Sequence, residues 1–166
     1  MAKKVIVNPM AIATAEFDVI RILGQEWSLL TRHQDQRSAN LKEVDFFQVD
    51  YVTCLIGSEP RISGWEKLDR LNNSTRIRHG STVFMGLWKD YKSNKKNSIL
   101  ELLYHREQGI TYVDFMGDVL EWKLFYGSFY YVLFFVRCDD GWRWGHCNLD
   151  GPWSKTNFTA VSSEST

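Results

Sequence analysis

Apolar residues gather in short runs along the chain, and many of these runs are rich in β-branched and aromatic side chains. Such runs are typical of strands, in which successive side chains point to opposite faces. Five stretches have this character: 44–55, 75–88, 110–119, 124–138 and 142–149. The sequence therefore predicts a sheet, with 124–138 as its long central strand.

Helical segments are fewer, and two of them open with a recognisable cap. Ser63 precedes Glu66 by three residues, and Ser98 precedes Glu101 in the same way. In such a capping box the two residues satisfy free backbone donors at the start of a helix. Apolar residues at helical spacing follow both boxes, and Gly109 can supply the left-handed residue that ends the second helix.

The N-terminal region allows two interpretations. Asn8 and Pro9 suit a cap followed by the first turn of a helix, which would run over residues 9–23 and end at Gly24. The apolar residues within 17–23 would also suit the two faces of a strand. We expect the helix and keep the strand as the alternative.

Only the helix expected after Ser98 clearly separates successive strands, so neighbouring strands should run antiparallel. We therefore predict an α+β fold, with a mostly antiparallel β-sheet, meander-like or partly closed, and two or three packed helices. With 166 residues, the chain is long enough for one domain with its own core. Residues 1–153 are predicted to form this single α+β domain, and residues 154–166 a loosely held polar C-terminal tail.

The charges of the chain cancel, with 20 lysines and arginines against 20 aspartates and glutamates. A nucleic-acid or anionic-membrane partner usually requires a clustered positive excess, so we do not expect a nucleic-acid partner. The lysines of residues 89–96 remain a weaker candidate for phosphate binding, because they precede the start of a predicted helix.

The cysteine content and the hydropathy pattern bear on the compartment. The longest apolar run is shorter than the ~20 residues that a membrane-spanning helix needs, and we find no secretory signal. Three cysteines, an odd number, are typical of free thiols in a reducing compartment. We therefore expect a cytoplasmic protein without a membrane partner.

Two cysteines, a histidine and two aspartates lie close together near the C-terminus. Asp140-Gly141 is a dipeptide favoured in two-residue hairpin turns, because both positions accept a positive φ. A turn there places Cys138 and Cys147 on one face, roughly 13 Å apart, and His146 on the other face. That separation excludes a disulfide, and His146 cannot share an ion with the thiols, so we expect no metal and no cofactor.

The other face of this hairpin carries Trp142, Trp144 and His146, with Arg137 on the neighbouring strand. Rings beside a cation suit a small aromatic or sugar-like ligand, or a side chain of a partner protein. Trp153 follows shortly afterwards and could extend the same surface. The alternative is that a helix covers this face, in which case the rings are ordinary core.

Candidates for catalysis are His79, His146 and Asp114, which are residue types that suit acid–base chemistry but lie in no recognisable motif. Asp114 and Asp118 would share one face of a strand, about 13 Å apart, which is too far for a catalytic carboxylate pair. We expect both aspartates to be solvated at the rim of the sheet, unless Gly117 introduces a bulge.

The tripeptide Arg78-His79-Gly80 is similar to the Arg-His-Gly signature of histidine phosphatases. In that family the tripeptide ends the first strand of an α/β fold, and a helix follows. Here it lies in the middle of the chain, before a stretch that has the composition of a strand. We therefore do not carry the phosphatase activity over to this chain.

Two functions are compatible with these features. Aromatic residues make up 14% of the chain, with seven tryptophans, and no catalytic motif accompanies them. This favours a non-catalytic binding or assembly protein that uses its aromatic hairpin face for a ligand or a partner subunit. Because a net charge near zero favours association, we expect a homo-oligomer or a protein partner. The alternative is a small-molecule enzyme with a sheet-lined pocket and a His/Asp acid–base pair.

Overall fold

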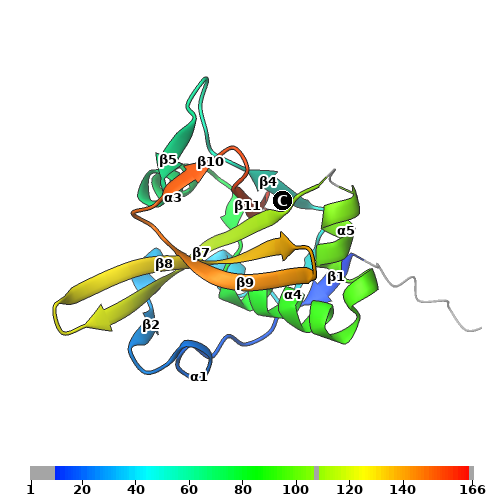
Figure 1. The fold of residues 1–166 in the computed structure, drawn as a ribbon, viewed down its shortest axis with the longest axis horizontal. Helices are drawn as coiled ribbons and strands as arrows, with labels where there is room; N and C mark the ends of the chain where they lie inside the picture. Colours follow the sequence, from blue (N-terminus) through cyan, green and yellow to red (C-terminus); the bar gives the residue numbers. More distant parts are fainter. Residues whose placement is uncertain (1–9, 107–108, 165–166) are drawn as a thin grey trace, which may run out of the picture.

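One extended sheet with helices on both faces forms the body of the protein (Figure 1). The computed structural model describes residues 10–106 and 109–164. The strands of the main sheet are β2 (Trp27–Leu29), β4 (Val49–Val52), β6 (Ile77–Arg78), β7 (Tyr112–Leu124), β8 (Gly127–Cys138), β9 (Gly141–Asn148) and β11 (Phe158–Ser162). Their order is β4-β11-β7-β8-β9, with β2 paired to β7 and β6 paired to β11. Only β11 and β7 are parallel, so the predicted α+β fold with a mostly antiparallel sheet is confirmed.

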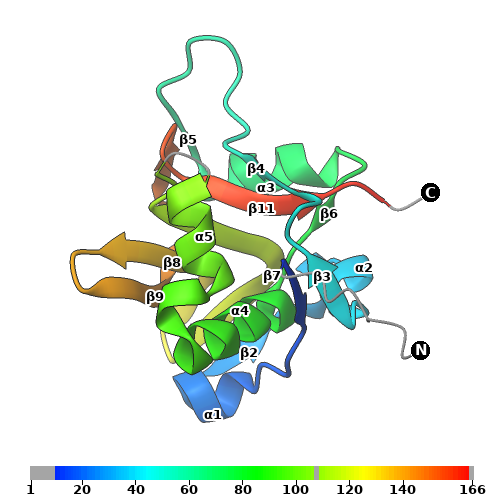
Figure 2. The ribbon, with the colours of Figure 1, turned by 90° about the vertical axis from the view of Figure 1, so that its right-hand side faces the viewer.

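Two short ribbons and five α-helices complete the described residues. The ribbons pair β1 (Ala11–Ala13) with β3 (Glu43–Asp45), and β5 (Arg61–Ser63) with β10 (Pro152–Ser154). The helices are α1 (Val19–Leu23), α2 (Gln36–Ala39), α3 (Gly64–Asn72), α4 (Ser81–Ser93) and α5 (Ile99–Arg106), with 3-10 turns at Thr31–His33 and Lys95–Asn97. Figure 2 shows α4 and α5 lying across one face of the sheet. No helix among the described residues is long and apolar enough to cross a membrane.

The strands β7, β8 and β9 form the predicted meander, but the central position belongs to β7. The stretch 124–138 was expected to be the central strand, whereas β8 begins only at Gly127, after a tight turn. Strand β7 pairs with β8 on one edge and with β11 and β2 on the other. The apolar run thus crosses a turn whose aromatic residues look like strand residues in the sequence.

Residues 75–88 form a two-residue strand and most of a helix, not the one or two strands that their composition predicts. Strand β6 ends at Arg78, and α4 begins at Ser81. The side chains of Val83, Phe84 and Leu87 are completely buried within α4. A helix that is apolar on nearly all sides has no polar stripe, so a short apolar run cannot be assigned to a helix or a strand by periodicity alone.

Helix α4 starts at a glycine and receives its cap from a distant strand. Gly80 is the N-cap residue and has no side chain to offer. The carboxylate of Asp118 on β7 accepts hydrogen bonds from the backbone N–H of Ser81 (2.6 Å) and from its hydroxyl. A carboxylate at this position also complements the positive end of the helix dipole. Asp118 is therefore buried at a helix terminus and not solvated at the sheet rim as predicted.

The serine half of each predicted capping box lies where the sequence places it, whereas the Glu66 carboxylate accepts from Arg70 and the Glu101 carboxylate pairs with Arg137. The hydroxyl of Ser63 accepts the backbone N–H of Glu66 (3.1 Å), and α3 follows. The hydroxyl of Ser98 accepts the backbone N–H of Glu101 (3.3 Å), and α5 follows. Gly109, just after the helical segment, has the predicted positive φ of +95°.

The predicted N-terminal helix over residues 9–23 is mostly wrong. Residues Ala11–Ala13 form β1, and only Val19–Leu23 is helical. The helix starts where the Asp18 carboxylate accepts the backbone N–H of Arg21 (3.0 Å), and it ends at Gly24 as predicted. Asn8 and Pro9, the expected cap, lie outside the described residues.

The C-terminal stretch is part of the core, so the prediction of a loose tail over 154–166 is wrong for its described residues. Strand β11 lies between β4 and β7, and Thr159, Ala160 and Val161 on it are completely buried. The error comes from treating small and polar residues as exposed ones. Thr159 can be buried without losing hydrogen bonding, because its hydroxyl donates to the Asp114 carboxylate.

Strand β7 is interrupted between Phe115 and Leu120. Phe115 pairs with Leu133 of β8 and Leu120 pairs with Tyr131, so residues 116–119 face a single residue of β8. Before the interruption β7 pairs with β11, and after it with β2. This β-bulge lets one long strand change its outer partner midway.

The backbone of the bulge bonds to two loops. The N–H of Gly117 donates to the carbonyl of His79 (2.8 Å), and its carbonyl accepts from the N–H of Asp35 (2.7 Å). The carbonyl of Val119 accepts from the N–H of Leu30 (2.9 Å). A Cβ at Gly117 would collide with the backbone of the β6–α4 connection, so this position requires glycine.

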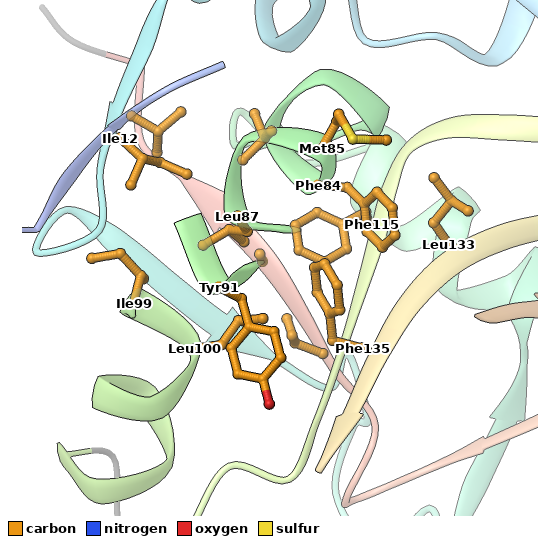
Figure 3. Close-up of a cluster of buried hydrophobic side chains, with 14 of the residues drawn as sticks. Ile12, Phe84, Met85, Leu87, Tyr91, Ile99, Leu100, Phe115, Leu133 and Phe135 are labelled. Carbon is orange, nitrogen blue, oxygen red and sulfur yellow. The ribbon is translucent and has the colours of Figure 1, made fainter. Parts of the chain in front are cut away.

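Two apolar clusters hold the layers together. On one face, the ring of Phe84 on α4 stacks on Phe135 of β8 (4.4 Å between centroids) and meets Phe115 edge-on at 5.5 Å (Figure 3). On the other face, α3 packs through Leu68 in a cluster that includes Trp153 of β10. The sheet is thus covered on both faces.

Phenylalanine-to-alanine substitutions at buried and exposed positions test this packing. Phe84→Ala removes a completely buried ring, and we expect it to lower the free energy of unfolding by ~3–5 kcal/mol. Phe47→Ala is the matched control, because Phe47 is 49% exposed and lies outside the sheet core, and it should change stability by less than about 1 kcal/mol. Urea denaturation of both variants measures the difference, and similar losses would contradict the packing described here.

Candidate functional site

The β8–β9 hairpin turns at residues 139–140, one position earlier than the predicted Asp140-Gly141. Gly141 is not a turn residue but pairs with Cys138. It has a φ of +125°, and a Cβ there would collide with the hydroxyl of Tyr91. The same hydroxyl accepts the backbone N–H of the following residue (3.0 Å), so the contact with α4 fixes the register.

The corrected register preserves the predicted faces, because every pair shifts by two residues. Cys147 lies opposite Val132, and His146 lies opposite Leu133, so the imidazole and the thiol point to opposite faces. Cys138 lies on the same face as Cys147. However, it is six residues along β8 from Val132, the residue that pairs with Cys147. All three cysteines of the chain are free thiols. Within the described residues no group of three His, Cys, Asp or Glu side chains could hold a metal ion.

The predicted binding residues of this hairpin do not form one open surface, because α4 and α5 cover most of the face. Trp142 is only 3% exposed. Trp144 is half-buried, with its ring edge-on to Phe84. Arg137 is engaged by α5, where it pairs with the Glu101 carboxylate (3.1 Å).

Trp153 does not extend this surface either. It lies on the opposite face of the sheet, 1% exposed, and its indole N–H donates to the Asp114 carboxylate (3.0 Å). Of the predicted residues only His146 is exposed. Its ring contacts Trp27 at 4.6 Å and Tyr131 at 5.0 Å, and partial burial lowers its pKa.

The catalytic candidates are not brought together. His79 is completely buried, and neither ring nitrogen has a hydrogen-bond partner among the described residues. A helix does follow Arg78-His79-Gly80, contrary to the expected strand, but the burial of the imidazole leaves no access for a phosphate group.

Asp114 is completely buried. Its carboxylate oxygens accept hydrogen bonds from groups other than a histidine, so it does not form the predicted His/Asp pair. Its carboxylate accepts hydrogen bonds from the ammonium of Lys67 (2.9 Å), the indole of Trp153 and the hydroxyl of Thr159. Lys67 is also completely buried, and it donates in addition to the carbonyl of Asn157 (2.8 Å). A buried ion pair with all these bonds is expensive to break, so Asp114 acts as a structural anchor between α3, β7 and β10–β11.

The lysine-rich stretch 89–96 lies on the last turns of α4 and the following 3-10 turn. The phosphate position considered at the next helix is already occupied, because the carboxylate of Asp90 accepts the backbone N–H of Ile99 (2.7 Å). Lys92 and Lys95 lie over the rings of neighbouring aromatic residues. Nothing in this arrangement favours a phosphate.

An exposed aromatic surface lies elsewhere, on the outer half of the β7–β8 hairpin. We call residues 122–129 the aromatic arm. Figure 1 shows this hairpin, in yellow, extending beyond the rest of the sheet. At its tip Phe125 is 100% exposed and Tyr126 is 66% exposed. Apolar rings so fully exposed on a projecting element commonly mark an interaction surface.

The rings of the arm form a continuous row back to the body of the protein. Tyr126 contacts Phe125 at 4.8 Å and Phe129 at 6.3 Å, and Phe129 contacts Trp122 at 6.1 Å. Trp122 in turn stacks on Trp27 of β2 at 5.8 Å. Through Trp27 the row reaches His146, so the one exposed residue of the predicted site adjoins the arm.

Beyond Lys123 the backbone of the arm is paired only within the hairpin. On the β7 edge the last outside bond runs from the N–H of Lys123 to the carbonyl of Glu26, just before β2 (2.9 Å). On the β8 edge the last bond runs from the N–H of Leu149 to Tyr130 (2.8 Å). No other described strand pairs with residues 124–129, so both ribbon edges offer free donors and acceptors.

Sequence reasoning missed the arm because it assigned these residues to one buried strand. The available signal was Gly127, whose φ is +157°, directly after two aromatic residues. A glycine inside an apolar run can mark a hairpin turn as well as a strand interior. Comparison of the chain with protein-family models, curated proteins and solved structures found no match.

The burial of His79 predicts a pH-dependent stability. Burial lowers the pKa of its imidazole from 6.5 to about 4. Below pH 6.5 the unfolded chain therefore binds a proton that the folded protein excludes, and stability is lost as the pH falls from 6.5 towards 4. Between pH 7.5 and pH 5 this loss is about 2 kcal/mol.

The variant His79→Met isolates this contribution, because the remaining histidines titrate in both proteins. We expect its free energy of unfolding, measured by urea denaturation, to fall by about 2 kcal/mol less than that of the unmodified protein over the same pH range. Parallel pH profiles would show that His79 is not excluded from protonation.

Proposed function

We propose that the protein is a non-catalytic assembly protein whose copies associate through the aromatic arm. The observation that carries this proposal is the exposure of Phe125 and Tyr126 at the tip of a projecting hairpin. Exposing two large rings to water is unfavourable by roughly 25 cal/mol for each Å² of apolar area. Burial against a partner recovers this free energy.

The convex shape of the arm favours a macromolecule over a small ligand. Small molecules bind in concave pockets that surround most of their surface. Four pockets among the described residues are lined by other residues, none of them in 122–129. A sugar-like or aromatic ligand would therefore contact the arm on one side only.

The charges around the arm favour a neutral partner, and a second copy of the chain is one. Lys123 is the only charged residue within 122–129, and it pairs with Glu121 (3.5 Å). An anionic membrane surface would be favoured by several unpaired cations. With a net charge of zero, two copies of the chain do not repel each other at long range.

The free ribbon edges supply the specificity that exposed rings alone lack. Two identical antiparallel ribbons can pair edge to edge about a two-fold axis, so that the same residues meet in both copies. Phe125 and Tyr126 contribute roughly 300 Å² per copy. Because a stable interface buries about 800 Å² per partner, the contact must also include the half-buried rings and the backbone of 124–129.

This assembly would function in the cytoplasm. The three free thiols support that location, because a reducing compartment keeps cysteines unpaired.

The oligomeric state tests the proposal. We expect size exclusion coupled to light scattering to show a dimer or larger assembly at micromolar concentrations. The double variant Phe125→Ser/Tyr126→Ser should weaken association at least 10-fold, since it removes both exposed rings. Ile20→Ser is the matched control, because Ile20 is 56% exposed on α1, away from the arm, and it should leave association unchanged.

Three outcomes would contradict the proposal. The protein could be a monomer at every concentration, the double variant could assemble as well as the unmodified protein, or the control could weaken assembly equally. A monomer that binds neutral phosphatidylcholine vesicles through the same two rings would assign the arm to a membrane surface instead.

A further inference from the structure

A pocket of about 440 Å³ lies between α3, the end of β4 and the loop that connects β4 to β5; we call it the α3 pocket. Figure 2 shows this loop extending away from the sheet at the top of the molecule. The volume falls within the range of roughly 300–1,000 Å³ that is usual for small-molecule sites. The pocket has no residue in common with the aromatic arm, so the two surfaces are independent.

The wall of the pocket is held in place by one arginine. Arg70 on α3 donates two hydrogen bonds to the Glu59 carboxylate (2.6 and 2.9 Å), one to Glu66 (2.9 Å) and one to the carbonyl of Cys54 (2.8 Å). The N–H of Ile56 donates to the same Glu59 carboxylate (2.9 Å). These bonds fix the loop to α3, so the pocket exists before any ligand binds.

The backbone at Cys54 shows that this shape is maintained against local strain. Cys54 has a φ of +62°, and it is the only residue other than glycine with a positive φ in the described ranges. A cysteine in the left-handed region is unfavourable, and such residues cluster at functional sites. Cys54 lines the pocket, and burial raises the pKa of its thiol, so the residue contributes an uncharged wall and not a nucleophile.

The lining combines an apolar interior with cationic groups. Val52, Leu55 and Leu71 supply apolar side chains, whereas Arg70 and Arg76 are the only charged residues in the lining. There is no carboxylate among the lining residues. A ligand that complements this surface has an apolar body and a negative charge.

Arg76 is the arginine that is free to meet such a charge. Arg70 already donates to two carboxylates and a carbonyl, whereas within residues 10–106 and 109–164 the guanidinium of Arg76 donates only to Asp50 (3.2 Å). Both side chains of that pair are well exposed, at 41% and 58%. Exposed pairs contribute little, so a ligand carboxylate can replace Asp50 at low cost and bond Arg76 through two nitrogens.

We infer that the α3 pocket binds a small monocarboxylate with an apolar body, such as a medium-chain fatty acid or an arylalkanoic acid. The apolar body lies against Val52, Leu55 and Leu71, and the carboxylate pairs with Arg76. Asn73, which also lines the pocket, has a side-chain amide that can donate to the same carboxylate.

Octanoate and 3-phenylpropionate are the probes, with octanamide as the uncharged analogue of the same size. Isothermal titration of the unmodified protein should show saturable binding of at least one carboxylate, and octanamide should bind at least 10-fold more weakly. Arg76→Gln should weaken carboxylate binding at least 10-fold. Arg61→Gln is the matched control, since Arg61 is an exposed arginine on β5 outside the pocket lining, and it should bind as the unmodified protein does.

Thermal unfolding of each variant shows whether the fold survives, and NMR shift changes confined to residues 52–56 and 70–76 would place the probe in the pocket. The inference is overturned if neither carboxylate binds, if octanamide binds equally, or if Arg76→Gln has no effect. Shift changes elsewhere would also overturn it. None of these results depends on the oligomeric state, so a failure here is distinct from a failure of the assembly proposal.

Discussion

The interruption of β7 at residues 116–119 is the constraint on which the architecture depends. Four residues face one residue of β8 there, and their backbone groups bond to the 30–35 segment and to the β6–α4 connection instead. The same segment supplies Asp118, which caps α4. A continuous β7 would leave the start of α4 and the 30–35 segment without their buried bonding partners, and each such group costs about 1–3 kcal/mol when left unsatisfied.

The bulge also divides the β7–β8 hairpin into an inner and an outer half, and the exposed part begins in the outer half, after the buried Leu120 and Glu121. The inner half lies between the two helical layers, where Phe84 and Lys67 reach it from opposite faces. The outer half pairs with the short β2 and then continues alone as the aromatic arm. Rings that look alike in the sequence therefore have different roles, because α4 and α5 extend far enough to cover Trp142 but do not reach Phe125.

Local signals in the sequence predicted local features well. The serine caps at Ser63 and Ser98 were found because their chemistry involves residues three positions apart. The hairpin turn was misplaced by one residue, yet the faces were right, since an even shift of register keeps every side chain on its face. What failed depended on tertiary burial. Helix α4 and strand β11 both lie in the interior. There the apolar periodicity does not distinguish a helix from a strand, and the polarity of a residue does not predict whether it is exposed.

Amide hydrogen exchange at two protein concentrations tests the central claim, that the hairpin consists of a fixed part that reaches through the bulge to residue 121 and an arm available for assembly. In dilute solution, amides within 113–121 should exchange only through global unfolding, whereas those of 124–129 should exchange fast. At a concentration where the protein assembles, we expect exchange in 124–129 to slow at least 10-fold, with 113–121 unchanged. Arm amides that are equally protected at both concentrations, or equally unprotected, would contradict the account.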